Sequence, residues 1–61
     1  MTQYELTQLA HNIEGSISKS GSFTEDAVIK YVNDNFFTFS ESDKTEIINA
    51  TLEEFFALPF Y

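Results

Sequence analysis

Apolar residues recur along this chain at the three- and four-residue spacing of an amphipathic helix. With successive residues set about 100° apart, the apolar residues of the first third fall within an arc of roughly 100°. These residues are Leu6, Leu9, Ala10, Ile13 and Ile17. An arc of this width is typical of one helix face packed on a core. The pattern therefore predicts a first helix over residues 3–18.

Two later segments follow the same period with wider apolar faces. Residues 24–36 carry apolar side chains over roughly 200° of a helix, which predicts a central second helix with neighbours on both sides. Residues 42–57 predict a third helix with an apolar face of roughly 180° and an acidic face opposite to it. The candidate acidic face consists of Asp43, Glu46, Glu53 and Glu54. Pro59 follows this segment and cannot continue a helix.

Side chains suited to helix capping stand before each of these segments. The predicted N-caps are Thr2, Ser22 and Ser40. Glu5 and Glu25 follow the first two caps at the spacing of a capping box, in which two side chains satisfy free backbone N–H groups. Gly15 is expected to weaken the first helix, and Gly21 to end it.

These elements predict a small all-α fold, a three-helix bundle within a single helical domain over residues 1–61. The first helix is expected to pack through Leu6, Leu9, Ile13 and Ile17, and the third through Ile48, Leu52 and Phe55. A chain of this length buries only about 60% of the surface that it exposes when unfolded. The bundle is therefore expected to close within one chain or to be completed by homodimerisation.

Aromatic residues are unusually abundant in the two segments that flank the third helix. The chain has seven Phe and three Tyr, and many of them fall within residues 36–39 and 58–61. Large apolar side chains in such segments are typical of interfaces. The candidate interface residues are Phe37, Phe39, Phe60 and Tyr61. The alternative is that the last segment folds back and caps the bundle.

The charge of the chain argues against direct contact with nucleic acid. Ten acidic residues stand against three Lys and no Arg, which gives a net charge of −7. Three short helices resemble a helix-turn-helix in topology, but the third would present carboxylates where phosphates require Lys or Arg. The same charge favours a basic protein as a partner.

Residues that could hold a metal or carry out catalysis are scarce. The chain has no Cys, and His11 is its only His, so neither a zinc site nor a catalytic triad is expected. Residues 33–44 fail as a calcium loop, because Thr38 replaces the turn glycine and Lys44 the closing acid. The adjacent acids Glu53 and Glu54 point about 100° apart on a helix, which does not favour shared acid–base work. We therefore expect no metal, no cofactor and no enzymatic activity.

The function expected from these patterns is non-enzymatic. The aromatic and apolar surface favours a protein–protein interaction or regulatory module whose partner is a second copy or another protein. The alternative is an acidic mimic of nucleic acid that inhibits a DNA- or RNA-binding protein. The start of the chain lacks the basic and apolar regions of a secretory signal, and no long apolar run predicts a membrane span. A cytoplasmic location is expected.

Overall fold

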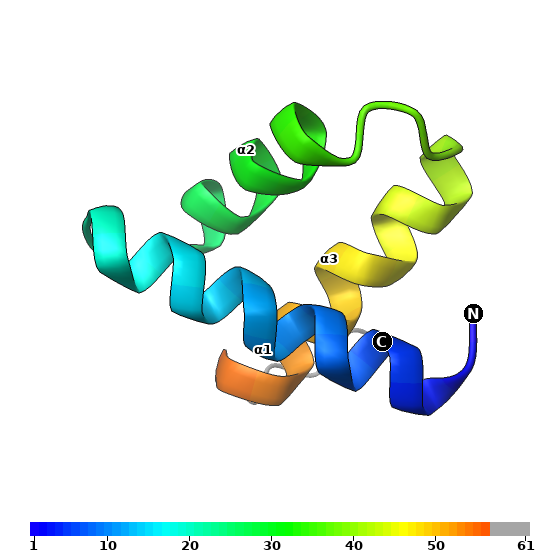
Figure 1. The fold of residues 1–61 in the computed structure, drawn as a ribbon, viewed down its shortest axis with the longest axis horizontal. Coiled ribbons are helices and arrows are strands. Elements are labelled where there is room, and N and C mark those ends of the chain that lie inside the picture. Colours follow the sequence, from blue (N-terminus) through cyan, green and yellow to red (C-terminus); the bar gives the residue numbers. More distant parts are fainter. Residues whose placement is uncertain (57–61) are drawn as a thin grey trace.

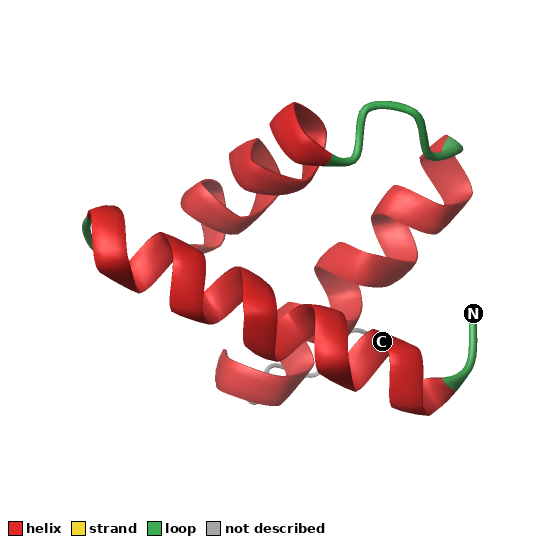
Figure 2. Ribbon diagram, viewed as in Figure 1, coloured by secondary structure: helices red, strands yellow, loops and turns green. Residues whose placement is uncertain are grey.

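The computed structural model describes residues 1–56, which form a small all-α bundle of three helices (Figures 1 and 2). The helices are α1 (Gln3–Ser20), α2 (Glu25–Asn35) and α3 (Glu41–Phe56). The three-helix fold is confirmed, and the predicted helix bounds hold to within two residues, although residue 57 lies outside the described residues. None of the helices within residues 1–56 combines the length and the apolar character needed to cross a membrane.

The predicted caps of the first and third helices are confirmed. The backbone N–H of Glu5 donates to the Thr2 hydroxyl oxygen over 3.1 Å, and the Thr2 N–H donates to the Glu5 carboxylate over 2.8 Å. This pair is a complete capping box. At the start of α3, the N–H of Asp43 donates to the Ser40 hydroxyl oxygen over 3.2 Å. Local side-chain chemistry therefore determines where α1 and α3 begin.

One local prediction is wrong. The N-cap of α2 is Thr24 and not Ser22, and the Thr24 hydroxyl oxygen accepts from the N–H of Ala27 over 3.2 Å. Because the helix begins after Thr24, the preceding Phe23 is left outside it, and its ring packs on aromatic residues of α3. The first helix runs through Gly15, as its predicted bounds require, and ends at Ser20 before Gly21, as expected. The expected weakening of α1 by Gly15 stays a prediction.

The core lies where the three helices face one another. Its buried apolar residues are Leu6, Ala10, Ile13, Ile17, Val28, Val32, Ile47 and Leu52. Thr51 is also fully buried, and its hydroxyl donates to the carbonyl oxygen of Ile47 over 2.8 Å. The expectation that the second helix is central is wrong, because α3 makes the most extensive contacts, first with α1 and then with α2. One side of the wide apolar arc of α2 stays open to solvent, where Ile29 is 38% exposed.

Some residues predicted for the core lie at its edge. Leu6, Ile13, Ile17 and Leu52 are buried as predicted, but Leu9, Ile48 and Phe55 are only half-buried. Instead, the α3 positions that pack most deeply are Ile47 and Thr51. Helical periodicity gives the direction of the apolar arc of α3, but α1 and α2 together determine which part of that arc is covered.

Four rings form an aromatic cluster at the end of α3. It consists of His11, Phe23, Phe55 and Phe56. Phe23 stacks on Phe56 with ring centroids 5.1 Å apart, and it meets Phe55 edge to face at 5.5 Å. His11 also meets Phe55 edge to face, with ring centroids 5.1 Å apart. The cluster therefore joins α1, the α1–α2 connection and α3.

Candidate functional site

An apolar hollow lies between the start of α1 and the loop that joins α2 to α3. We call it the apolar hollow; its apolar residues are Met1, Tyr4, Leu9 and Phe39, and Glu5 and Gln8 also line it. Its volume is about 420 Å³, and it opens to solvent. Apolar side chains that line an open concavity are typical of surfaces that bind another molecule.

The capping box of α1 holds one wall of the apolar hollow in place. Thr2 and Glu5 bond to each other around the first turn, which fixes the backbone that directly follows Met1 and carries Tyr4. Tyr4 lies outside the buried stripe of α1 and is 73% exposed, while Met1 is 45% exposed. These two residues were not predicted as site residues. The sequence feature that could have identified Tyr4 is that an aromatic residue stands on the polar face of the first helical turn.

A tight turn builds the opposite wall. After α2 ends, the N–H of Phe39 donates to the carbonyl oxygen of Phe36 over 3.0 Å, which is the bond of a β-turn. This turn brings the rings of Phe36 and Phe39 edge to face at 5.2 Å. The two central residues, Phe37 and Thr38, lie at the tip of the turn and are exposed.

The candidate interface residues therefore divide. Phe39 lines the apolar hollow, whereas Phe37 is 71% exposed at the tip of the turn and is not among the residues that line it. Phe60 and Tyr61, the other two candidates, lie outside the described residues. The structure thus brings Phe39 together with Met1 and Tyr4.

A second concavity lies between α1 and α3, and we call it the acidic groove. It is lined by Glu46, Glu53 and Glu54 together with Gln3, Leu6, Thr7, Asn49 and Ala50, and its volume is about 270 Å³. Three of the four predicted acidic-face residues therefore line one groove. The fourth, Asp43, is half-buried in the first turn of α3 and does not line it.

His11 stands beside the acidic groove and links α1 to α3. Its Nε2 atom lies 3.7 Å from a carboxylate oxygen of Glu54, and both side chains remain well exposed. Its ring also meets the ring of Phe55 edge to face. The sequence predicted a surface side chain, and the structure adds these contacts between helices.

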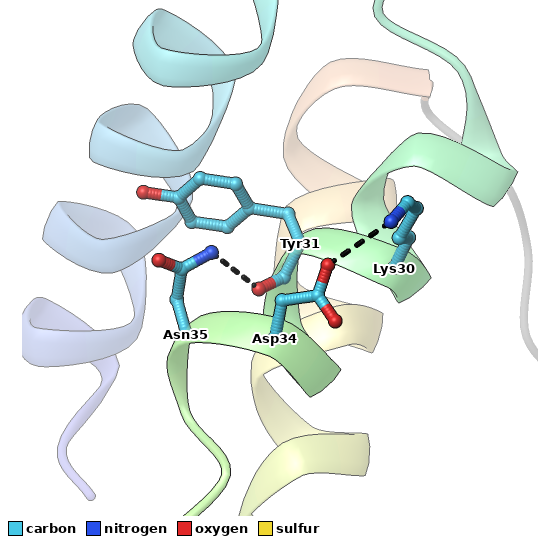
Figure 3. Close-up of polar contacts among 4 residues, drawn as sticks. All are labelled: Lys30, Tyr31, Asp34 and Asn35. Atoms are coloured by element: carbon cyan, nitrogen blue, oxygen red, sulfur yellow. Dashed lines mark hydrogen bonds and ion pairs between the residues drawn. The ribbon is translucent and has the colours of Figure 1, made fainter.

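Two of the three Lys residues pair with acids on their own helices. In α2, the Lys30 ammonium lies 3.2 Å from a carboxylate oxygen of Asp34, and Figure 3 shows this pair beside Tyr31 and Asn35. In α3, the Lys44 ammonium lies 3.8 Å from Glu41, and the Lys44 side chain is only 13% exposed. These cations offset carboxylates outside the acidic groove. The groove therefore keeps its negative charge.

The two concavities differ in the chemistry they can perform. The apolar hollow can remove apolar side chains of another molecule from water. The acidic groove can pair with cations, because the carboxylates of Glu46 and Glu53 that line it are exposed. Within residues 1–56, no group of three or more His, Cys, Asp or Glu is placed to hold a metal ion.

Comparison of the chain with models of protein families, with characterised proteins and with solved structures finds no significant match. The function is therefore argued from the chain's own residues, and above all from the two concavities that α1 shares with its neighbours.

Proposed function

We propose that this chain is a non-enzymatic protein–protein interaction module that acts in the cytoplasm and docks its partner at the apolar hollow. The observation that carries the proposal is the exposure of Met1 and Tyr4 in a hollow that Phe39 completes. A single exposed apolar residue is ordinary in a soluble protein, whereas several around one concavity mark an interaction site.

The residue types in the hollow suit this role. Aromatic residues and Met are enriched in protein interfaces, and Tyr is among the residues that most often dominate binding energy. Burying one Leu or Phe side chain of a partner in the hollow would contribute about 1.5–3 kcal/mol. The partner is either a second copy of this chain or another protein.

Photo-crosslinking from the apolar hollow tests the proposal. Tyr4 is replaced by a benzophenone amino acid, and the same replacement at Asn33, an exposed residue of α2, serves as the control. We expect one discrete adduct from the Tyr4 position and none from the Asn33 position. An adduct of twice the 7.0 kDa chain mass would identify a second copy, and any other mass would identify another protein. Equal labelling from both positions, or none from Tyr4, would contradict the proposal.

The acidic groove supports a second candidate, an acidic mimic of nucleic acid that inhibits a DNA- or RNA-binding protein. Its supporting observation is that Glu46, Glu53 and Glu54 line one groove in place of phosphates. Exposed charges are screened by salt, so binding to such a partner should weaken steeply as ionic strength rises. Binding that is independent of salt, or unchanged in Glu46→Gln/Glu53→Gln, would rule out the mimic.

A further inference from the structure

We infer that the partner of the apolar hollow is a basic segment, in which Lys or Arg residues stand about three to four residues from the apolar anchor. The apolar side chain occupies the hollow, and the cations cross α1 to reach the acidic groove. This inference rests on the proposed docking function and adds the chemical class of the partner.

The placement of the two concavities on α1 sets this spacing. Tyr4 and Gln8 line the apolar hollow, while Gln3 and Thr7 line the acidic groove. These residues are neighbours in the chain, so the exposed ridge of α1 alone separates the two concavities at this level. A helix is about 10 Å across, and an extended chain advances about 3.3 Å per residue. A segment that crosses α1 therefore needs about three to four residues to touch both.

Charge complementarity selects a basic occupant for this surface. The chain carries a net charge of −7, and the acidic groove adds three carboxylates within reach of the segment. A basic segment is drawn toward this field before contact and then pairs with the groove after contact. An acidic or neutral segment with the same apolar anchor lacks this second contribution.

Charge also disfavours a second copy as the occupant of the apolar hollow. Two chains that each carry −7 repel each other at close range. The chain also offers few cations for the groove of a neighbour, because Lys30 is paired with Asp34 and the side chain of Lys44 is largely covered. A basic partner removes the repulsion that a second copy would introduce.

Three synthetic peptides and the isotope-labelled protein test the inference by NMR. The first peptide carries Phe and Leu separated by about three uncharged residues from a run of Arg, so that the first Arg stands about four residues from the apolar anchor. The second has Glu in place of Arg, and the third has Ser in place of Phe and Leu. We expect the first peptide to shift the backbone amides of Tyr4, Gln8 and Phe39 together with those of Asn49 and Glu53. The second and third should bind at least about tenfold more weakly.

Variants of the protein separate a local effect of the groove from the effect of total charge. Glu46→Gln/Glu53→Gln should weaken binding of the first peptide several-fold. The matched control, Glu25→Gln/Asp26→Asn, removes the same charge at the start of α2, away from both concavities. It should leave binding of the first peptide nearly unchanged. Equal weakening by both variants would overturn the crossing geometry.

Other outcomes distinguish this inference from the proposed function. If the Arg and Glu peptides occupy the apolar hollow with equal affinity, the partner is not selected by charge, and the docking function stands. If crosslinking from Tyr4 yields only the mass of two chains, the inference is overturned and the docking function again stands. If no peptide shifts the hollow amides and Tyr4 yields no adduct, both are overturned.

Discussion

Phe23 stacks face to face on Phe56, with ring centroids 5.1 Å apart and ring planes within 10° of parallel. The two residues come from the connection that precedes α2 and from the last turn of α3. Their contact therefore ties the beginning of one helix to the end of another. In a bundle of three short helices, such contacts outside the central core supply a considerable share of the total stability.

Replacing Phe23 by Ala should destabilise the protein by about 2 kcal/mol, which is less than for a fully buried Phe because this ring is only half-buried. Phe37→Ala is the matched control, since Phe37 is exposed at the tip of a turn, and it should change the free energy of unfolding by less than about 0.5 kcal/mol. Urea denaturation followed by circular dichroism measures both changes. Equal effects of the two substitutions would show that the aromatic cluster does not stabilise the fold.

Gly15→Ala should stabilise the protein by about 0.5–1 kcal/mol. Gly15 lies inside α1, and a Cβ atom added there meets no other atom within 4 Å. The substitution therefore restricts the unfolded chain without a clash in the folded one. Thermal unfolding of Gly15→Ala should give a higher Tm than the unchanged chain. A lower Tm would mean that α1 is not regular at this position.

Thr51→Val should leave the stability unchanged or raise it slightly. Thr51 is fully buried, and its hydroxyl donates only to the carbonyl oxygen of Ile47 one turn earlier. That oxygen is also an acceptor for the backbone hydrogen bonds of the helix, so the hydroxyl is not needed to satisfy it. Thr51→Ser keeps the hydroxyl but leaves a methyl-sized cavity, which should cost about 1 kcal/mol. Denaturant midpoints compare the two variants. A large decrease in the free energy of unfolding of Thr51→Val would contradict this prediction, because it would mean that the hydroxyl stabilises the fold by more than its single hydrogen bond explains.

The capping box should make the start of α1 sensitive to acid. Hydrogen bonds from the Thr2 backbone N–H and then from its hydroxyl hold the pKa of Glu5 below the usual value of 4.5. A lowered pKa in the folded state means that the contribution to stability is complete above pH 4.5 and is lost as pH falls through the folded value. Amide exchange in the first turn of α1 should therefore accelerate in acid.

Two variants check the assignment of this acid sensitivity. Glu5→Gln should remove the pH dependence of exchange in the first turn, because the amide does not titrate. Glu14→Gln alters a half-buried acid of α1 that accepts a hydrogen bond from Ser18, and it should leave the pH dependence of the first turn intact. Retention of the full pH response in Glu5→Gln would contradict the role of the capping box in holding Met1 and Tyr4.

Much of the fold follows from the sequence because the signals that define single helices are local. The box at Thr2 and the cap at Ser40 predict two helix starts that the structure confirms. The position of α3 between its neighbours could not be predicted in this way. A wide apolar arc shows that a helix has apolar surface to bury, but not which neighbours bury it, and Ile29 of α2 stays partly exposed.

The candidate site was only partly predictable for a similar reason. Aromatic abundance marked both Phe37 and Phe39, but the β-turn that separates them sends one ring to solvent and the other to the apolar hollow. Met1 and Tyr4 were missed because they stand outside the apolar stripe of α1, and only the tertiary arrangement places them opposite Phe39. The grouping of Glu46, Glu53 and Glu54 was predicted because they share one side of a single helix.

The docking surface is tested most directly by calorimetry with the partner that crosslinks from the Tyr4 position. The affinity of this partner is measured for Phe39→Ser and for Phe37→Ser. Both variants lose one Phe from the same turn, and only Phe39 lines the apolar hollow. We expect Phe39→Ser to weaken binding at least about tenfold, and Phe37→Ser to change it less than about twofold. Weakening by Phe37→Ser that equals or exceeds that of Phe39→Ser would contradict the assignment of the apolar hollow as the docking site.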